Sequence, residues 1–238
     1  MSATRSRPTR TTEWLGKGIY TLADAARFAS MPAQSARRWI LGYDFGSGDQ
    51  TRRSSPPVFE RELPDVDGEI ALTFLDLVEL LFVRRFRDRG VPLQTIRRAA
   101  AVAAEMFGEE KHPFAVRRFE TDGQTVLARI EAEDREHLLD LARRQHVFRE
   151  VFDPLIHKLD YELDRAARWW PLGKEVPVVV DPNIAFGQPT IAGVGVPTDT
   201  LAATARAWGD IERVARWYDV DPEAVRAALR YEDQQDAA

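Results

Sequence analysis

Four polar side chains that could recognise nucleic acid lie close together near the start of the chain: Gln34, Ser35, Arg37 and Arg38. Arginine and glutamine can each make two hydrogen bonds to the edge of a base, and arginine also binds phosphate oxygens. No acidic residue occurs between Arg27 and Tyr43, so no carboxylate in this stretch would repel a phosphate backbone. The spacing predicts a DNA-reading surface, although a helical core with solvated arginines would have the same composition.

The sequence contains no comparable pattern for catalysis or metal binding. It has no cysteine, which excludes disulfides, thiolate nucleophiles and cysteine-ligated metals. The histidines lack the HxxxH or HExxH spacing of a zinc site, and they stand at His112, His137, His146 and His157. Neither a GxxxxGK[ST] phosphate-binding loop nor a GxSxG nucleophile elbow is present. We therefore expect a protein that is not an enzyme, with no catalytic residue, no metal and no cofactor.

The net charge of −5 is distributed unevenly along the 238 residues. Residues 1–55 carry nine basic and four acidic side chains (+5), and residues 84–118 again carry nine and four (+5). Residues 56–83 carry one and seven (−6), and residues 119–238 carry fourteen and twenty-three (−9). Basic blocks of this kind often accompany nucleic-acid contact, although an arginine-rich, lysine-poor composition also follows from GC-rich coding.

The overall composition is that of a globular protein, with 44% hydrophobic and 30% charged residues. No apolar run approaches the roughly 18–20 residues that span a bilayer, and the basic N-terminus has no apolar segment behind it. We expect a cytoplasmic protein without a membrane partner.

Short helices and small hairpins are the elements that must position the polar side chains. Thr21 is expected to cap a helix from Leu22 to Ala29, which Met31-Pro32 ends, and a second helix is expected over Ala33–Leu41. The turn between them makes a helix-turn-helix unit. A loop rich in Gly, Ser and Pro follows, and then a hairpin in which Val58–Phe59 pairs with Ile70–Leu72.

The middle of the chain is expected to be helical, with one more hairpin. The predicted elements are a helix from Thr73 to Arg89, a helix from Pro92 to Phe107, a hairpin of residues 114–119 and 125–130, and a long helix over 133–169. The apolar face of the long helix would pair with a second copy of the chain to form a dimer, or would pack on the C-terminal part of its own chain.

The C-terminal part is expected to form a small helical module. It contains a predicted strand at Val176–Val180, an irregular stretch rich in glycine, and three short helices over Thr198–Trp208, Asp210–Tyr218 and Asp221–Tyr231. The fold class is therefore mainly α with small β-hairpins.

Two separated segments resemble the DNA-binding domain of MerR-type regulators. Tyr20-Thr-Leu-Ala-Asp-Ala-Ala followed by Ser35-Ala-Arg-Arg-Trp is similar to the first helix and the recognition helix of that family. Leu72-Thr-Phe-Leu-Asp-Leu and Arg89-Gly-Val-Pro-Leu-Gln-Thr-Ile-Arg-Arg are similar to its third and fourth helices. The resemblance implies a MerR-like winged helix-turn-helix in which Arg52 and Arg53 of the wing contact phosphate.

The C-terminal part resembles a recurrent small antitoxin domain. Asp181-Pro-Asn-Ile-Ala-Phe-Gly-Gln-Pro-Thr-Ile-Ala-Gly and the last helix, Asp221-Pro-Glu-Ala-Val-Arg-Ala-Ala-Leu-Arg-Tyr, follow the pattern of that family. One dipeptide departs from it: Val194-Gly195 stands where the family has Thr-Arg. Acidic residues at the start of the last helix disfavour contact with DNA, so we assign this module to partner binding.

Together the two resemblances identify the chain as similar to longer VapB-type antitoxins. They imply a homodimeric DNA-binding repressor of its own operon, with operator DNA and a PIN-type ribonuclease toxin as partners. The expected domains are a flexible tail (1–17), the DNA-binding domain (18–108), a hairpin with the long linking and dimerisation helix (109–170) and the C-terminal module (171–238). Expected partner-binding residues are Trp208, Arg213, Trp217, Tyr218, Arg226, Arg230 and Tyr231, although at least half of the aromatic ones would also suit a small core.

Two other functions stay open. One is a MerR-like regulator whose C-terminal half holds a small-molecule pocket lined by Trp169, Trp170 and Trp208. The other is a nucleic-acid enzyme, which the absence of clustered acids with His or Lys disfavours.

Overall fold

The structure is a computed structural model. The part of the chain that it describes comprises residues 16–46, 53–109, 111–119 and 154–237. Several predictions lie outside the described residues: those for residues 1–15 of the tail, for Arg52, for the strand at 125–130 and for the long helix before residue 154.

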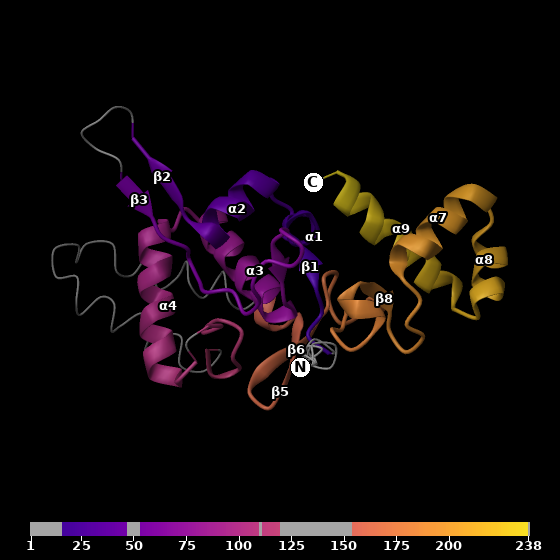
Figure 1. The fold of residues 1–238 in the computed structure, drawn as a ribbon. Coiled ribbons are helices and arrows are strands. Elements are labelled where there is room, and N and C mark those ends of the chain that lie inside the picture. The colour runs from indigo at the N-terminus through magenta and orange to yellow at the C-terminus, as the bar shows by residue number, and fades with distance from the viewer. Residues whose placement is uncertain (1–15, 47–52, 110, 120–153, 238) are drawn as a thin grey trace, which may run out of the picture.

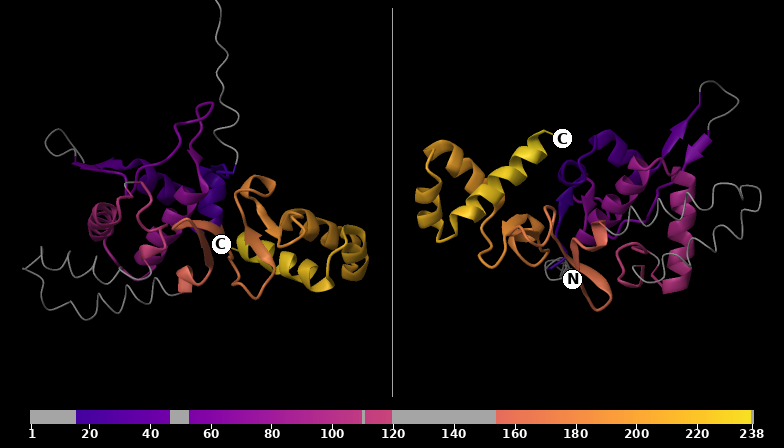
Figure 2. Two further views of the ribbon diagram at one scale, coloured as in Figure 1. Left: turned by 90° about the horizontal axis from the view of Figure 1, so that it is seen from below. Right: turned by 180° about the vertical axis from the view of Figure 1, so that it is seen from behind.

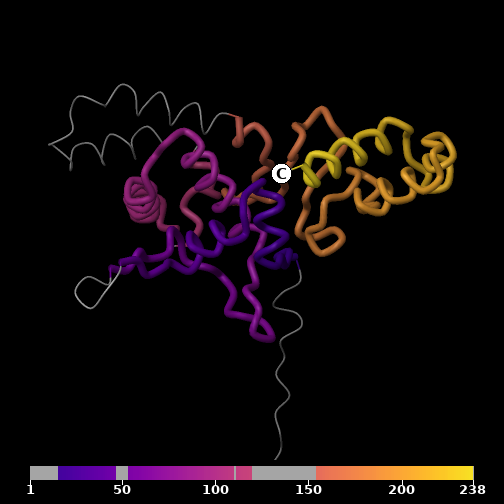
Figure 3. The backbone as a smooth tube through the Cα atoms, turned by 90° about the horizontal axis from the view of Figure 1, so that it is seen from above, coloured from indigo at the N-terminus to yellow at the C-terminus, as the bar shows by residue number. Residues whose placement is uncertain are grey.

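The described chain forms two lobes that lie side by side (Figures 1 and 2). The front lobe comprises the described residues from 16 to 170, and the rear lobe comprises residues 171–237. Each lobe has its own hydrophobic core: Leu72, Leu77 and Phe86 lie in the core of the front lobe, and Leu201 and Val225 lie in that of the rear lobe. α9 runs from the outer part of the rear lobe back toward the junction, where its C-terminal end lies between the lobes (Figure 3).

The helices of the front lobe begin and end where local signals predict. They are α1 (Leu22–Phe28), α2 (Ala33–Leu41), α3 (Phe74–Asp88) and α4 (Leu93–Phe107). Thr21 and Thr73 cap α1 and α3, and each accepts a hydrogen bond from the amide of the aspartate three residues later, whose carboxylate bonds back to the cap. Gly108 ends α4 in the left-handed conformation, with a φ of +68°.

The strand pairing in the front lobe differs from the prediction. β4 (Ala71–Leu72) pairs with β1 (Tyr20–Thr21), and Val58–Phe59 forms no strand. The first hairpin of the lobe is instead made by β2 (Tyr43–Phe45) and β3 (Arg53–Ser55), in a stretch predicted to be a loop. β1 precedes α1, whereas β4 follows β3, so the two paired strands lie about fifty residues apart in the sequence. The prediction paired segments that are closer together in the sequence.

A four-stranded antiparallel sheet joins the two lobes. Its strands, in order, are β5 (Leu159–Glu162), β6 (Arg165–Trp169), β7 (Val178–Val180) and β8 (Pro189–Ile191). β5 and β6 contribute Leu159, Ala166 and Trp169 to the front core, while Val178 and Ile191 belong to the rear core. The two lobes meet within the sheet where Trp169 of β6 pairs with Val180 of β7.

The predicted helix does not continue to Trp169. Leu163 and Asp164 form the two-residue tip of the β5–β6 hairpin and both have positive φ, as tight hairpin turns require. Leu163, which the helical pattern places on the apolar face, is fully exposed at this tip. The sequence here favours helix locally, but the hairpin buries Leu159 and Trp169 in the front core, and that burial outweighs the local preference.

The rear lobe follows the prediction closely. Its helices are α7 (Thr198–Trp208), α8 (Ile211–Tyr218) and α9 (Pro222–Asp236), and a short 3-10 turn at Ala185–Gly187 precedes β8. Asp210 and Asp221 cap α8 and α9 as expected. α9 runs past the predicted end at Tyr231, so its last turns reach the front lobe.

Buried acids of α3 hold the segment that follows α4. Glu79 Oε1 accepts hydrogen bonds from the amides of Phe114 (2.7 Å) and Ala115 (3.0 Å), and Asp76 Oδ1 lies 2.9 Å from His112 Nε2. These contacts replace the strand predicted at 114–119, where Val116 makes only an isolated bridge, to Arg165.

Among the described residues, no helix is long and apolar enough to cross a membrane.

Glu79→Gln should change how stability depends on pH. Burial raises the pKa of Glu79 well above its usual value; the charges of Asp76 and Glu109 act in the same direction, and the two amide hydrogen bonds oppose them. The folded state therefore holds a proton that the unfolded state loses above about pH 4.5. The free energy of unfolding falls as the pH rises from about 4.5 toward the raised pKa of the folded state.

Glutamine keeps the acceptor for both amides and has no charge to bury. We expect the free energy of unfolding of the variant to rise relative to that of the wild type between about pH 5 and pH 7.5, measured by urea unfolding at both values. The exposed control Glu60→Gln should show no such gain. A difference between variant and wild type that is the same at both pH values would contradict the assignment.

Candidate nucleic-acid interface and partner surface

The α1–α2 pair is a packed helix-turn-helix whose second helix presents a polar face. Ala25, Ala26 and Phe28 of α1 are buried against Ala36 and Ile40 of α2. The turn at Ser30 has a φ of +49° and leads into Pro32, the N-cap of α2. Trp39 O accepts a hydrogen bond of 2.8 Å from the amide of Val58, which connects the end of α2 to the segment at residues 56–59.

The predicted base-reading residues lie together on the outer side of α2. Gln34, Arg37 and Arg38 are exposed, and Ser35 is half-buried. The guanidinium of Arg38 lies 5.5 Å from the centre of the Tyr43 ring, a cation–π contact that holds it near β2. The first turn of α2 carries no acidic side chain and no side-chain cap, so the positive end of the helix dipole is open to an anion.

A short β-ribbon projects beside α2, and we call β2 and β3 the wing (Figure 1). Gly42 makes the link from α2 to the wing: its φ is +76°, and a Cβ atom there would lie 2.5 Å from the backbone oxygen of Ser55. Only glycine therefore allows α2 to pass directly into β2. Arg53 is exposed on β3, opposite Phe45, while Arg52 lies outside the described residues.

Arg97 of α4 anchors the base of the wing, a role that the sequence analysis missed. Its guanidinium donates hydrogen bonds to Ser55 Oγ (2.8 Å), Pro56 O (2.6 Å) and Pro57 O (3.2 Å). Three acceptors on consecutive residues fix the direction in which β3 leaves the lobe. The basic block 84–118 was the available signal, but nothing in the sequence separates an arginine that positions the wing from one that contacts phosphate.

The rear lobe exposes an aromatic face, which we define as Trp208, Arg213 and Trp217. The two indole rings meet edge to face at 5.9 Å, and the Arg213 guanidinium lies 4.6 Å from the Trp208 ring. Trp217 keeps 72% of its surface exposed. Exposed tryptophans stacked with an arginine have the composition of protein–protein hot spots.

The other predicted partner-binding residues do not all belong to this face. Arg226 is exposed and pairs with Glu212 (3.1 Å) and Glu223 (3.5 Å), and Arg230 is also exposed. Tyr218 is half-buried, with its hydroxyl 3.2 Å from Thr204 Oγ1. Tyr231 is fully buried and is therefore not a surface residue, because α9 directs it into the rear core and toward the junction of the lobes.

The three tryptophans proposed to line an effector pocket do not converge. Trp170 Nε1 donates a hydrogen bond to Asp160 Oδ2, and Trp208 lies on the aromatic face. Trp169 borders a cleft at the junction of the lobes, and neither of the other two tryptophans lines that cleft. Within the described ranges, no group of three or more His, Asp and Glu side chains could hold a metal ion.

Contacts across the junction hold the helix-turn-helix against the rear lobe. The Tyr20 hydroxyl donates a hydrogen bond of 2.9 Å to Gly187 O, and Arg27 Nη1 lies 3.4 Å from Glu232 Oε2. Gly187 has a φ of +84°, and a Cβ atom there would lie 2.3 Å from the Tyr20 hydroxyl. The close approach of the lobes at this point requires glycine.

Comparison with known proteins gives two family matches, two relatives by sequence and one solved structure. Residues 18–100 match a family described as "Putative DNA-binding HTH domain", and residues 178–231 match "Protein of unknown function (DUF433)". The Mycobacterium tuberculosis protein named "Putative antitoxin VapB45" is 30% identical over 223 residues, which cover 89% of this chain and 92% of that protein. "Uncharacterized protein Rv2308" of the same organism is 26% identical over 235 residues and covers 92% of each chain.

A solved structure has the same fold over nearly the whole chain. The crystal structure of Rv2018 from Mycobacterium tuberculosis aligns with a TM-score of 0.69 and 26% identity, covering 88% of this chain and 96% of that one. The two family matches fall on separate lobes, the first on the helix-turn-helix and the second on β7 to α9.

Arg97→Met should loosen the wing without unfolding the lobe. The variant keeps the apolar stem of the side chain but loses all three hydrogen bonds to residues 55–57. Because these bonds are partly exposed, we expect amide hydrogen exchange at the non-proline residues of 53–58 to rise by about three- to tenfold, with exchange of α3 unchanged. Exchange measured by mass spectrometry checks this, with Gln94→Met on the exposed side of α4 as the control. Unchanged exchange in residues 53–58 would remove Arg97 as the anchor.

Proposed function

This chain belongs to the same family as the mycobacterial protein named "Putative antitoxin VapB45", and on that premise we propose that it is a DNA-binding antitoxin. The observation that carries the proposal is the separation of two faces on two lobes. The polar side of α2 with the wing belongs to the front lobe, and the aromatic face belongs to the rear lobe. One protein of this kind can hold DNA and a toxin at the same time.

In this proposal the front lobe reads operator DNA as a winged helix-turn-helix of the MerR type. α2 enters the major groove, where Gln34, Arg37 and Arg38 reach base edges and phosphates and Ser35 contacts the backbone. The wing lies along the neighbouring phosphates, to which Arg53 and Arg52 add positive charge. The exposure of the α2 side chains and the anchoring of the wing by Arg97 support this arrangement.

The protein would act in the cytoplasm as a homodimer that represses its own operon. Two copies related by a two-fold axis would place their α2 helices about 34–36 Å apart, in successive major grooves of a palindromic operator. Residues 133–153, whose apolar spacing suggested the dimer contact, lie outside the described residues.

The rear lobe would bind and silence a PIN-type ribonuclease encoded beside it. In this proposal the aromatic face supplies the anchors, and Arg226, Arg230 and Tyr218 add further contacts to the toxin. Residues 171–238 carry eleven acidic and six basic side chains, a charge that complements the basic groove of an RNA-cleaving partner. Inhibition would be steric and electrostatic, so the protein itself would not be an enzyme.

A second candidate is a MerR-like regulator that responds to a small molecule. One observation favours it: Trp169 borders a cleft between the lobes. A ligand in this cleft is compatible both with the antitoxin and with the small-molecule-responsive regulator. What distinguishes the two candidates is whether the protein binds a toxin encoded by a neighbouring gene.

Replacing Arg37 and Arg38 with alanine should weaken binding to the DNA upstream of the gene. Both side chains are exposed, so the fold should keep its melting temperature while each lost phosphate contact reduces the salt slope of binding by about 1. Fluorescence anisotropy at several salt concentrations measures both the affinity and the slope.

The control for this pair removes two exposed arginines from elsewhere, with Arg117→Ala and Arg216→Ala together. It carries the same change in net charge and should retain the wild-type slope. If the α2 double variant binds with an unchanged slope, α2 does not contact DNA.

Trp217→Ala should weaken capture of the product of the adjacent gene by at least about tenfold, because exposed interface tryptophans are frequent hot spots. Binding to DNA should not change, since α8 lies in the other lobe. Phe186→Ala, which removes another exposed aromatic ring outside the aromatic face, is the control. Calorimetric titration of the two purified proteins gives the result, and wild-type affinity in the Trp217 variant would move the toxin site elsewhere.

A further inference from the structure

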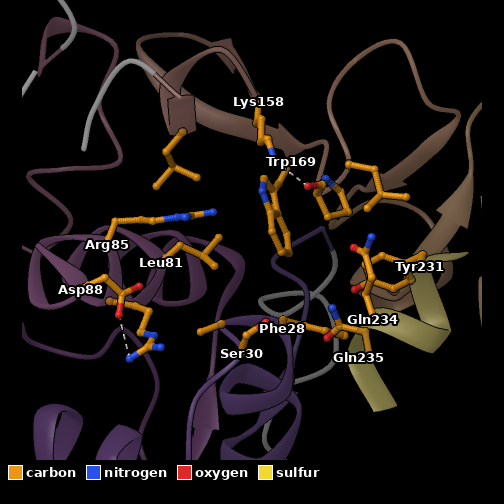
Figure 4. Close-up of a pocket in the computed structure, with 15 residues that line it drawn as sticks. Phe28, Ser30, Leu81, Arg85, Asp88, Lys158, Trp169, Tyr231, Gln234 and Gln235 are labelled. Carbon is orange, nitrogen blue, oxygen red and sulfur yellow. Dashed lines mark hydrogen bonds and ion pairs between the residues drawn. The ribbon is translucent and has the colours of Figure 1, made fainter. Parts of the chain in front are cut away.

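The junction cleft is a cavity of about 330 Å³ between the two lobes (Figure 4). Phe28 and Ser30 border it at the end of α1, Leu81 and Arg85 on α3, and Gln235 on α9. Trp169 and Lys158 of the hairpin region complete the wall on the front-lobe side. The volume is at the lower end of the range found for small-molecule sites.

Unpartnered polar atoms gather around this cleft. In the described part of the chain, four buried side-chain polar atoms have no hydrogen-bond partner, and three of them belong to residues that line it: Trp169 Nε1, Tyr231 Oη and Gln235 Oε1. Trp169 is 5% exposed and Tyr231 is fully buried. Two of these atoms can donate a hydrogen bond and one can only accept, and buried polar groups in folded proteins nearly always have a partner.

The charge of the lining is positive. Arg84 is paired with Asp88 at 3.0 Å, and Asp88 is the one acidic residue among the lining residues. Arg85 and Lys158 are left without an acidic partner among the described residues; Lys158 Nζ donates only to Pro171 O, at 2.8 Å. Burial and the neighbouring charge of Arg85 lower the pKa of Lys158, so an anion between the two would relieve an unfavourable arrangement.

Apolar side chains line the rest of the cleft, among them Phe28, Leu81 and Leu155. Figure 4 shows Arg85 extending from α3 toward the indole of Trp169, so the cationic and aromatic groups face the same space. We propose that the junction cleft binds a small organic carboxylate with an apolar body. The carboxylate lies between Arg85 and Lys158, the apolar body packs beside Trp169, and Gln235 accepts a hydrogen bond from a donor on the ligand.

The position of the site connects it to both lobes. Phe28 is the last residue of α1, Ser30 lies in the turn between α1 and α2, and Gln235 belongs to the last turn of α9. A ligand that contacts all of them binds best when the lobes are held together, so it stabilises that arrangement. The binding itself does not depend on DNA or on a toxin, and a failure of either proposed partner leaves it in place.

Isothermal titration of the full chain with 4-hydroxybenzoate tests the proposal, because this probe carries a carboxylate, an apolar ring and one hydroxyl donor. We expect saturable binding of one molecule per chain, with a Kd on the order of 1 mM or tighter. Arg85→Gln should weaken binding at least tenfold without lowering the melting temperature, since Arg85 is exposed. Arg117→Gln, an equal loss of charge outside the cleft, should bind like the wild type.

Two further probes separate the contributions of charge and of the apolar body. The neutral 4-hydroxybenzamide and the small anion acetate should each bind at least tenfold more weakly than 4-hydroxybenzoate. Absence of saturable binding of 4-hydroxybenzoate would overturn the proposal, and so would equal affinity for the amide or for acetate. Unchanged affinity in Arg85→Gln would place the probe elsewhere and would equally reject the site.

Discussion

The four-stranded sheet shared by the two lobes is the constraint on which the rest of the arrangement depends. β5 and β6 pack on the front core, and Ile191 of β8 packs in the rear core. β7 contributes to both, with Val180 in the front core and Val178 in the rear core, so the pairing of β6 with β7 sets how the lobes meet. Tyr20 and Gly187 can touch only because this pairing brings their segments together. The junction cleft and the contact between Arg27 and Glu232 follow from the same geometry.

This geometry keeps the two proposed binding faces apart. α2 and the wing lie on the front lobe, whereas Trp208 and Trp217 lie on the outer helices of the rear lobe (Figure 2). A DNA duplex on one face therefore leaves the other accessible to a protein partner. α9 packs on α7 and α8, which carry the aromatic face, and its last turns line the junction cleft together with residues of α1 and α3.

The front lobe uses ionisable side chains in two different ways. Asp76 and Glu79 are buried, and each accepts backbone hydrogen bonds, so they hold neighbouring segments at the cost of burying polar groups. Arg97 is partly exposed and keeps its charge at the surface while fixing the wing. Arg37 and Arg38 extend into solvent, which suits side chains that must exchange water for a ligand.

Local chemistry was enough to predict α1 to α4 and α7 to α9. Thr21, Thr73, Asp210 and Asp221 as caps, with Gly108 as a stop, act within a few residues of chain, so the sequence predicts their positions. The same holds for the polar side of α2, because the 3.6-residue period places Gln34, Arg37 and Arg38 on one side.

Only the tertiary structure decided the strands, the wing anchor and the cleft. The partner of β4 is fifty residues earlier in the chain, and the partners of Arg97 are about forty residues away. Residues 159–169 have helix-forming side chains, yet they fold as a hairpin because Leu159 and Trp169 then reach the front core. Strand pairing and burial stabilise the protein through contacts between residues that are far apart in the sequence, whereas a helix cap acts within one turn. The sequence alone therefore determined the capped helices, and the tertiary contacts decided the strands and the cleft.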